Sequence, residues 1–504
     1  MSRPDLEVVL INPGSRTHVY QALGAELAAI EPPVWAGLMA TYLRRAGHTV
    51  IILDAEAEEW TPEQVAERVA DLKPRLAAVV VYGHQPSAST QNMTAAGAIC
   101  AAIKQHAPAQ AVLLVGGHVA ALPERTMEEE DVDFACSGEG PITLLELTEA
   151  LKTAQPDFSK VRGLLYREHG QVQRTPAAPL VKDLDGEMPE LAWDLLPMEK
   201  YRAHNWHCFD GLKRQPYAAI YTTLGCPYHC SFCCIQAPFK SGEKELGLKV
   251  STNSYRFWGI PAIMAQIGRL VKEYGVRNIK IADEMFVLHP RHVLGLCDAI
   301  IERGYDLNIW AYARVDTVRD EMLDKLKRAG VNWLAFGIEA ASERVRQDVQ
   351  KGFGQEEIFK TIGKVRAAGI NVIANYIFGL PEDDMETMQA TLDMALELNC
   401  EFANLYSAMA YPGSALYELA VQNTWPLPAR WSGYSQHAVD SLPLPTKYLS
   451  GAEVLQFRDQ AFQTYFASPR YLEMVRQKFG PETMEHIRQM ASHKLVRHSA
   501  VAAR

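Results

Sequence analysis

Residues 225–233 read GCPYHCSFC, so Cys226, Cys230 and Cys233 stand in a CxxxCxxC spacing. The apolar run at 218–223 just before them predicts a β-strand, and a helix-like segment at 260–274 follows. A loop that carries three thiols at the end of a strand is typical of a functional loop in a parallel α/β barrel. This stretch therefore indicates both the fold of the surrounding region and the place of its chemistry.

Three thiolates on one short loop can bind three irons of a [4Fe–4S] cubane and leave the fourth iron open to another ligand. Phe232, between two of the cysteines, is expected to shield such a cluster from solvent. Two alternatives stay open from the residues alone. A structural zinc site could use Cys234 or His229 as a fourth ligand, and a pair of the thiols could act as a redox dithiol. We interpret Cys234 as a buried neighbour.

Strand-like and helix-like segments continue to alternate after the cysteine loop. Six such units within about 200 residues predict a partial parallel (β/α)6 barrel, with functional side chains on the loops after the strands. The expected strands are 218–223, 278–282, 308–312, 333–337, 371–378 and 404–408. The expected helices are 260–274, 291–303, 319–329, 356–368 and 385–398.

The first part of the chain alternates in the same way. Its short apolar runs are typical of strands buried on both faces, and the intervening segments have helical spacing. This pattern predicts a doubly wound, Rossmann-like sheet with a ligand crevice beyond the carboxyl ends of its strands. A simple dinucleotide site is disfavoured, because no GxGxxG follows the first strand. The expected strands are 7–12, 49–53, 77–82, 111–115 and 133–136.

The pattern divides the 504 residues into four regions. Prolines interrupt every long element of the second region, which we interpret as a linker, and the last region looks helical and is a possible substrate cap. The predicted regions are 1–152, 153–215, 216–424 and 425–504.

Composition narrows the class of protein. A formal net charge of −10 argues against general nucleic-acid binding. No run approaches the roughly 18 uncharged apolar residues of a membrane span, and the N-terminus does not resemble a signal peptide, so we expect a cytoplasmic protein. Nine cysteines, four of them within nine residues, suit metal binding better than disulfide bonding.

The CxxxCxxC loop after the first barrel strand closely resembles that of the radical S-adenosylmethionine (SAM) superfamily. The resemblance covers roughly residues 215–420 and implies that Cys226, Cys230 and Cys233 hold a [4Fe–4S] cluster whose open iron binds SAM. Turns after later strands resemble other family motifs, although Ala282-Asp283-Glu284 replaces the usual Gly-Gly-Glu-like turn. The SAM-binding residues implied are Phe232, Asp283, Glu284, Arg314, Glu339 and Gly379.

The preceding domain resembles the cobalamin-binding class of the same superfamily. Glycines at successive strand ends would let the backbone lie close to a corrin or its nucleotide tail. The Asp-x-His-x-x-Gly motif of many cobalamin proteins is absent, so the sequence does not predict a bond from a histidine to cobalt, and His84 and His118 stay open as neighbours of the cofactor. The contacts implied are Asn12, Pro13, Gly14, Gly83, Ser87, Gly116, Gly117, His118, Gly138, Glu139 and Gly140.

This resemblance implies a methyltransferase that moves a methyl group from methylcobalamin to an unactivated carbon by way of a 5′-deoxyadenosyl radical. The alternative is an oxidative cyclase of the anaerobic magnesium-protoporphyrin monomethyl ester type, which shares a Pro-Pro-x-Trp start like Pro32–Trp35. A third hypothesis is a non-catalytic corrinoid carrier or sensor. By resemblance, reduced flavodoxin or ferredoxin is the expected electron donor, and the substrate is an unidentified small molecule.

Overall fold

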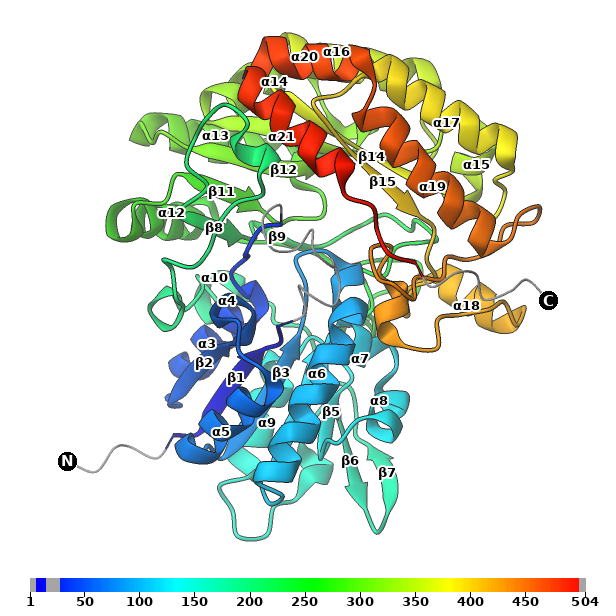
Figure 1. The fold of residues 1–504 in the computed structure, drawn as a ribbon. Helices are drawn as coiled ribbons and strands as arrows, with labels where there is room; N and C mark the ends of the chain where they lie inside the picture. Colours follow the sequence, from blue (N-terminus) through cyan, green and yellow to red (C-terminus); the bar gives the residue numbers. More distant parts are fainter. Residues whose placement is uncertain (1–5, 15–27, 498–504) are drawn as a thin grey trace.

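The computed structural model describes residues 6–14 and 28–497 and contains two large sheets, one in each half of the chain (Figure 1). The first sheet has the strand order β2-β1-β3-β4-β5-β6-β7, and β1 to β5 run parallel. Its strands are β1 Val8–Asn12, β2 Val50–Asp54, β3 Leu76–Val81, β4 Val112–Gly116, β5 Phe134–Cys136, β6 Leu164–Glu168 and β7 Gln171–Arg174.

Helices cover both faces of this sheet, as the doubly wound prediction requires. Val8 and Leu10 of β1 pack into one apolar core, whereas Val9 and Ile11 pack into a second core on the opposite face. Each strand residue therefore contributes to a core, which explains why the strands read as continuous apolar runs. The helices are α3 Val34–Arg45, α4 Ala55–Glu58, α5 Pro62–Leu72, α6 Pro86–His106, α7 Gly117–Ala121, α8 Pro123–Glu129 and α9 Pro141–Ala150.

The segment interpreted as a linker contributes to both halves of the molecule. Its antiparallel strands β6 and β7 extend the first sheet beyond β5. Farther along, Trp206 lies 5.1 Å from Trp310 and 5.5 Å from Trp333, measured between ring centroids. These three large aromatic rings are buried against one another, so this part of the segment packs into the barrel interior. Its helical turns are η1 Phe158–Lys160, α10 Leu184–Glu187, η2 Trp193–Leu195 and η3 Trp206–Cys208.

The second sheet is the predicted partial barrel, with parallel strands in the order β15-β14-β13-β12-β11-β8. They are β8 Tyr217–Ile220, β11 Asn278–Ile281, β12 Asn308–Ala313, β13 Val331–Glu339, β14 Asn371–Phe378 and β15 Phe402–Ser407. A small antiparallel pair, β9 Thr223–Gly225 and β10 Tyr255–Phe257, flanks the cysteine loop. The helices and helical turns are α11 Lys240–Glu245, α12 Ile260–Tyr274, η4 Phe286–Leu288, α13 Pro290–Arg303, η5 Val315–Thr317, α14 Asp320–Arg328, α15 Glu343–Asp348, α16 Gln355–Ala367, α17 Met385–Leu398 and α18 Ala415–Gln422.

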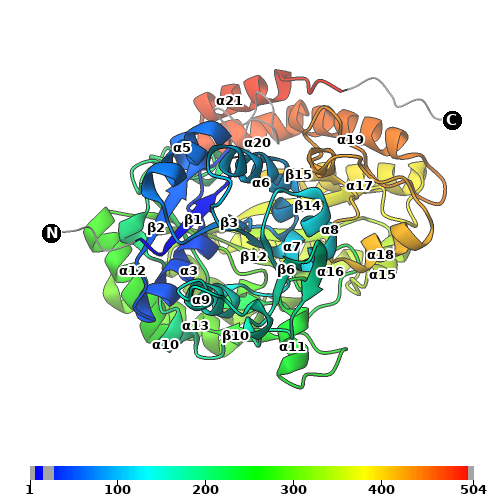
Figure 2. The same ribbon diagram turned by 90° about the horizontal axis from the view of Figure 1, so that it is seen from below.

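The C-terminal region covers the open edge of the barrel. Strand β15 has a neighbour on one side only, so its outer edge needs hydrogen-bond partners. Arg458 Nε donates to the carbonyl oxygen of Leu405 (2.7 Å), and the backbone N–H of Ser407 donates to Gln436 Oε1 (3.2 Å). Figures 1 and 2 show the C-terminal helices gathered along one side of the barrel. They are α19 Gly451–Phe466, α20 Pro469–Phe479 and α21 Pro481–Ser492. The helical turn η6 Trp431–Tyr434 packs instead against the first half of the chain, where the Trp431 ring contacts His118.

Within residues 6–14 and 28–497, every helix is too short or too polar to span a lipid bilayer.

Candidate functional site

The cysteine loop leaves the barrel directly after β9 and is tied to its surroundings through its backbone. The amide of Asn253 donates to the carbonyl oxygen of Tyr228 (2.7 Å). Cys226 is buried, and Cys230 and Cys233 are half-buried. The loop therefore presents its thiols from a braced backbone at the carboxyl end of the barrel.

The donor set fits a cluster. Among the described residues, no group of three or more histidine, cysteine, aspartate or glutamate side chains is arranged to hold a metal ion. A cubane needs no such convergence, because each of its thiolates binds a different iron atom. Of the two candidate fourth ligands for zinc, His229 is exposed, and Cys234 is buried next to Cys233.

The two acidic residues after β11 have different environments. Asp283 braces the first barrel strand, because its Oδ1 accepts the backbone N–H of Thr222 (2.6 Å) and its other oxygen accepts the Thr222 hydroxyl. Glu284 lines the cavity described below, and its Oε1 is buried without a hydrogen-bond partner. Burial raises the pKa of Glu284 to about 8. Glu284 thus has an acceptor available for a ligand, whereas both oxygens of Asp283 are occupied.

Arg314, directly after β12, lies beside the cysteine loop. Its Nη1 is 3.8 Å from the sulfur of Cys230, and its guanidinium stacks over Tyr228 at 4.0 Å from the ring centroid. Asp316 accepts from Nε (2.8 Å) and Nη2 (2.9 Å) and fixes the orientation of the planar group. Arg314 lines the cavity and holds a positive charge next to the thiols.

Glu339 ends β13 and pairs with a lysine that the sequence analysis missed. Lys351 donates to Glu339 Oε1 and to the carbonyl oxygen of Gly337 (3.1 Å). A Cβ at Gly337 would lie 2.4 Å from Glu339 Oε1 and 2.6 Å from Lys351 Nζ, so a larger residue there would displace the ends of these two side chains. Lys351 lies 12 residues after Glu339 in the sequence, and no local motif connects the two residues.

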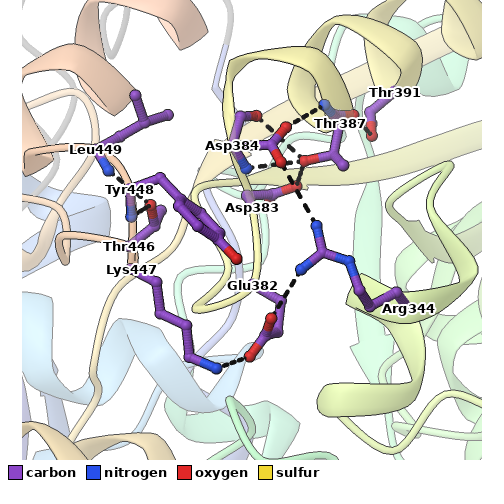
Figure 3. Close-up of polar contacts among 10 residues, drawn as sticks. All are labelled: Arg344, Glu382, Asp383, Asp384, Thr387, Thr391, Thr446, Lys447, Tyr448 and Leu449. Atoms are coloured by element: carbon purple, nitrogen blue, oxygen red, sulfur yellow. Dashed lines mark hydrogen bonds and ion pairs between the residues drawn. The ribbon is translucent and has the colours of Figure 1, made fainter.

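Gly379 begins a turn that lies outside the cavity and is held by a network around Asp383 (Figure 3). Asp383 Oδ2 accepts the backbone N–H groups of Gly379 (3.0 Å) and Leu380 (3.1 Å). The neighbouring Glu382 accepts from Arg344 (2.7 Å) and from Lys447 of the C-terminal region. The turn therefore connects the barrel to the segment that covers its edge.

A cavity of about 610 Å³ joins the two halves of the molecule. Loops after β1 and β3 of the first sheet line one side, and barrel residues line the other. From the barrel, the predicted residues Phe232, Cys233, Glu284, Arg314 and Glu339 contribute to its wall. A cavity between the carboxyl ends of two parallel sheets is the expected place for ligands in such folds.

The predicted cobalamin residues fall into two groups. Asn12, Pro13, Gly83 and Ser87 line the large cavity. Gly117 lines a smaller neighbouring cavity of about 30 Å³. The order β2-β1-β3 makes the gap between β1 and β3 the switch point of the sheet, and the first group lies on the loops at this gap.

The remaining members of the predicted set line neither of these two cavities, and two of them make contacts within the fold. A Cβ at Gly116 would lie 2.1 Å from the carbonyl oxygen of Val81, so glycine allows β3 and β4 their close approach. Glu139 accepts from the backbone N–H of Val181 (2.9 Å) and from Arg256 (2.6 Å). The other residues of this group are Gly14, His118, Gly138 and Gly140.

His118 lies beneath an aromatic ring of the C-terminal region. Its ring centroid is 4.3 Å from that of Trp431, and its Nδ1 is 3.1 Å from the Thr90 hydroxyl. Burial lowers the pKa of His118 to about 3, so its imidazole is neutral at physiological pH.

A buried ionic group at the interface of the halves was also missed. Glu31 Oε1 accepts from Lys280 (3.0 Å) and from the Tyr217 hydroxyl (2.9 Å), and Glu31 Oε2 is 3.2 Å from His84 Nδ1. Glu31, His84 and Lys280 all line the cavity. A lysine inside an apolar strand was the one available signal, because a buried lysine requires an anionic partner.

Comparisons with known proteins agree with this arrangement. A model of the Radical SAM superfamily matches residues 220–395, and a model of the B12 binding domain matches residues 20–148. An uncharacterized methyltransferase of Pyrococcus horikoshii is 26% identical over 468 residues, which cover 93% of this chain and 94% of that protein. The anaerobic magnesium-protoporphyrin IX monomethyl ester cyclase of Rubrivivax gelatinosus is 28% identical over 420 residues, covering 82% and 70% of the two chains.

A solved structure shares the whole fold. The radical SAM methyltransferase TsrM from Kitasatospora setae, with cobalamin and a [4Fe–4S] cluster bound, superimposes with a TM-score of 0.66. The match covers 97% of this chain and 100% of TsrM, at 17% sequence identity. With both family models matched in the order of the two halves, the chain belongs to the cobalamin-dependent radical SAM enzymes, whose cofactors are a [4Fe–4S] cluster, SAM and cobalamin.

Proposed function

We propose that this enzyme is a methyltransferase that adds a methyl group to an unactivated carbon centre of a small molecule. The observation that carries the proposal is a single cavity lined by Asn12 and Gly83 from the first half and by Cys233, Glu284 and Glu339 from the barrel. When bound, the cluster and SAM would supply a 5′-deoxyadenosyl radical, and cobalamin would supply a transferable methyl group. The similarity to an archaeal methyltransferase over 93% of the chain favours methyl transfer.

The cysteine triad would hold the cluster, and nearby side chains would orient SAM. The unpartnered Glu284 Oε1 would accept a hydrogen bond from the methionine ammonium. Arg314 would attract the methionine carboxylate, because Asp316 fixes its planar group beside the cysteine loop. Lys351 keeps Glu339 in position to accept hydrogen bonds from ribose hydroxyls.

Apolar packing would keep water from the cluster. Phe232 packs against a small core that contains Ala340, Leu380 and Ala408. The predicted role of Gly379 then becomes indirect, because its turn, held by Asp383, places Leu380 in that core. Exclusion of water strengthens every polar contact inside the cavity.

The switch point of the first sheet would hold cobalamin. We propose direct contacts from the loops after β1 and β3 and from α6, namely Asn12, Pro13, Gly83 and Ser87, together with Gly117 at the neighbouring cavity. The rest of the predicted set would act through the fold, by setting the spacing of β3, β4 and α9.

Reduced flavodoxin or ferredoxin is the proposed electron donor, because reductive cleavage of SAM consumes one electron per turnover. The half-buried Cys230 and Cys233 place the cluster loop near the protein surface. This supports electron entry from an external carrier.

Anaerobic reconstitution with iron, sulfide and cobalamin tests the proposal. With SAM labelled at the methyl group by deuterium and a small-molecule extract as substrate source, we expect 5′-deoxyadenosine and a product that carries the CD3 label. Absence of both in protein that contains its cluster would contradict the proposal. It would also revive the hypothesis of a corrinoid carrier or sensor.

An oxidative cyclase is the second candidate, favoured by the 28% identity to the Rubrivivax gelatinosus enzyme over 82% of this chain. The two candidates differ in their products. Incubation with magnesium-protoporphyrin monomethyl ester would yield an additional ring and oxygen in the cyclase case, without CD3 label. Methyl transfer would yield the label without ring closure.

A further inference from the structure

Two arginines share one carboxylate at the open edge of the barrel, and one of them, Arg458, lines the cavity. Arg458, with 3% of its surface exposed, lines the cavity, and its Nη1 donates to Asp459 Oδ1 (2.9 Å). Arg497 donates to both oxygens of the same carboxylate, at 3.0 Å and 2.9 Å. One carboxylate is thus shared by two guanidinium groups, which leaves a net charge of about +1 around it.

The neighbouring side chains do not cancel this charge. Burial and the two arginines lower the pKa of His437, which keeps its ring neutral, and burial raises the pKa of Tyr406 to about 12. Elsewhere in the cavity wall, lysines are matched one to one: Lys280 with Glu31, and Lys351 with Glu339. Because Arg458 shares its only described counter-ion with Arg497, a ligand that supplies an anion would be stabilised here.

Hydrogen-bond donors lie beside the same arginine. Arg458 bonds the carbonyl oxygen of Leu405, and Gln436 bonds the backbone N–H of Ser407, so both side chains lie along one stretch of strand β15. The Ser407 hydroxyl is buried and has no hydrogen-bond partner. Ser407, Gln436 and Arg458 all line the cavity. An unpartnered hydroxyl and an arginine in the wall of one cavity suit an oxyanion with several acceptors.

We propose that Arg458, Ser407 and Gln436 form a subsite for an anionic group of the substrate, a carboxylate or a phosphate. The subsite rests on the proposed function, because it assigns part of that cavity to the substrate. Phe402 and Phe462 line the adjoining wall and would contact an apolar or aromatic remainder of the molecule. The C-terminal region then selects the substrate in addition to covering the edge of the barrel.

Two isosteric probes test the charge requirement on the full chain. Indole-3-acetate carries a carboxylate, and indole-3-acetamide replaces it with a neutral amide. Calorimetric titration should show binding of the acetate about tenfold tighter than that of the amide, because charge-assisted hydrogen bonds are roughly twice as strong as neutral ones. Competition by inorganic phosphate identifies a phosphate-type occupant, and its failure to compete identifies a carboxylate.

Variants with opposite expected effects localise the subsite. Arg458→Gln should abolish the preference for the acetate, whereas Asp459→Asn should increase it, because the local charge rises by one. Arg458→Lys should keep part of the preference. Arg476→Gln, which removes an exposed arginine paired with Glu473, is the matched control and should keep the full preference.

Circular dichroism checks that each variant is folded. Equal binding of acetate and amide by the wild type, or an unchanged preference in folded Arg458→Gln, overturns the subsite. Iron content and 5′-deoxyadenosine formation are measured on the same preparations. Their absence, with the acetate preference intact, overturns the proposed function and leaves the subsite standing.

Discussion

The two parallel sheets place their predicted ligand residues differently. In the barrel, loops after several neighbouring strands supply residues that reach the cavity, such as Glu284, Arg314 and Glu339. In the first sheet, the cavity is reached from the loops after β1 and β3, whereas Gly116 at the end of β4 and Glu139 after β5 do not line it and contact other parts of the fold. In a closed or nearly closed barrel, the carboxyl ends of all strands surround one opening. In an open doubly wound sheet, the ligand crevice lies only where the strand order reverses.

This difference teaches that a strand-end motif has to be weighed by the topology of its sheet. Gly116 and Gly138, near the ends of β4 and β5, look like ligand contacts in the sequence, yet they line neither of the two cavities. Four experiments would break or sharpen this comparison.

The largest effect is expected at the cysteine loop of the barrel. Cys230→Ala should reduce iron from about four per chain to background and abolish 5′-deoxyadenosine formation, because a cubane with one protein ligand fewer is lost from the loop. Iron analysis and electron paramagnetic resonance after anaerobic reconstitution measure the effect. Cys234→Ala is the matched control, and equal iron loss there would contradict the assignment of the triad.

The second effect concerns the switch point of the first sheet. Ser87→Trp should fill the crevice and reduce cobalamin retention about tenfold or more, because overpacking costs about 1–3 kcal/mol. Gly138→Ala, at a strand end away from the switch point, should retain cobalamin at the wild-type level. Absorbance of cobalamin after gel filtration measures both, and a reversed order would refute the division of the first sheet into contacts and packing.

The third effect tests the buried pair of the barrel. Lys351→Met should lower the free energy of unfolding by about 3 kcal/mol, because Glu339 is left as an unpaired buried carboxylate. The double variant Lys351→Met/Glu339→Gln should recover most of this loss. Urea unfolding without cofactors measures the difference. A double variant as unstable as the single one would mean that Lys351 acts through something other than Glu339.

The smallest effect concerns Asp54, a buried carboxyl group at the end of strand β2 in the first sheet. Its Oδ1 accepts from Asn12 (2.7 Å) and its Oδ2 from the Tyr201 hydroxyl (2.7 Å), and burial raises its pKa from 3.8 to about 6. A carboxyl group whose pKa is raised in the folded state contributes to stability at low pH. This contribution is lost as the pH rises through the folded-state pKa.

The free energy of unfolding of the wild type, relative to Asp54→Asn, should therefore fall by on the order of 2 kcal/mol between about pH 4 and pH 6. Denaturant titrations at several pH values measure this difference. Parallel pH profiles of the two proteins would show that Asp54 keeps its ordinary pKa.

Local patterns predicted most of the fold. The strand at 371–378 and the helices at 260–274 and 385–398 have the expected bounds, because their apolar spacing and end signals agree with their tertiary environment. The β6–β7 hairpin and the aromatic packing of Trp206 were not predicted as parts of larger units. Their short segments are ordered by contacts with residues far away in the sequence.

In the candidate site, too, some features follow from local sequence and others depend on distant contacts. A spacing within nine residues marked the cysteine triad, because its ligands share one loop. Lys351 with Glu339, and Lys280 with Glu31, become partners only when strands and loops from separate units meet. No local pattern encodes such pairs.

By itself, the sequence determined the order of strands and helices, the position of the cysteine loop and the family, since these depend on short-range spacing and on the periodicity of burial. Only the tertiary structure decided which strand ends reach the cavity, and that Arg458, in the cavity wall, shares Asp459 with Arg497. The physical reason is that cavities and buried charge balances are sums over side chains from distant segments, and packing alone brings these side chains together.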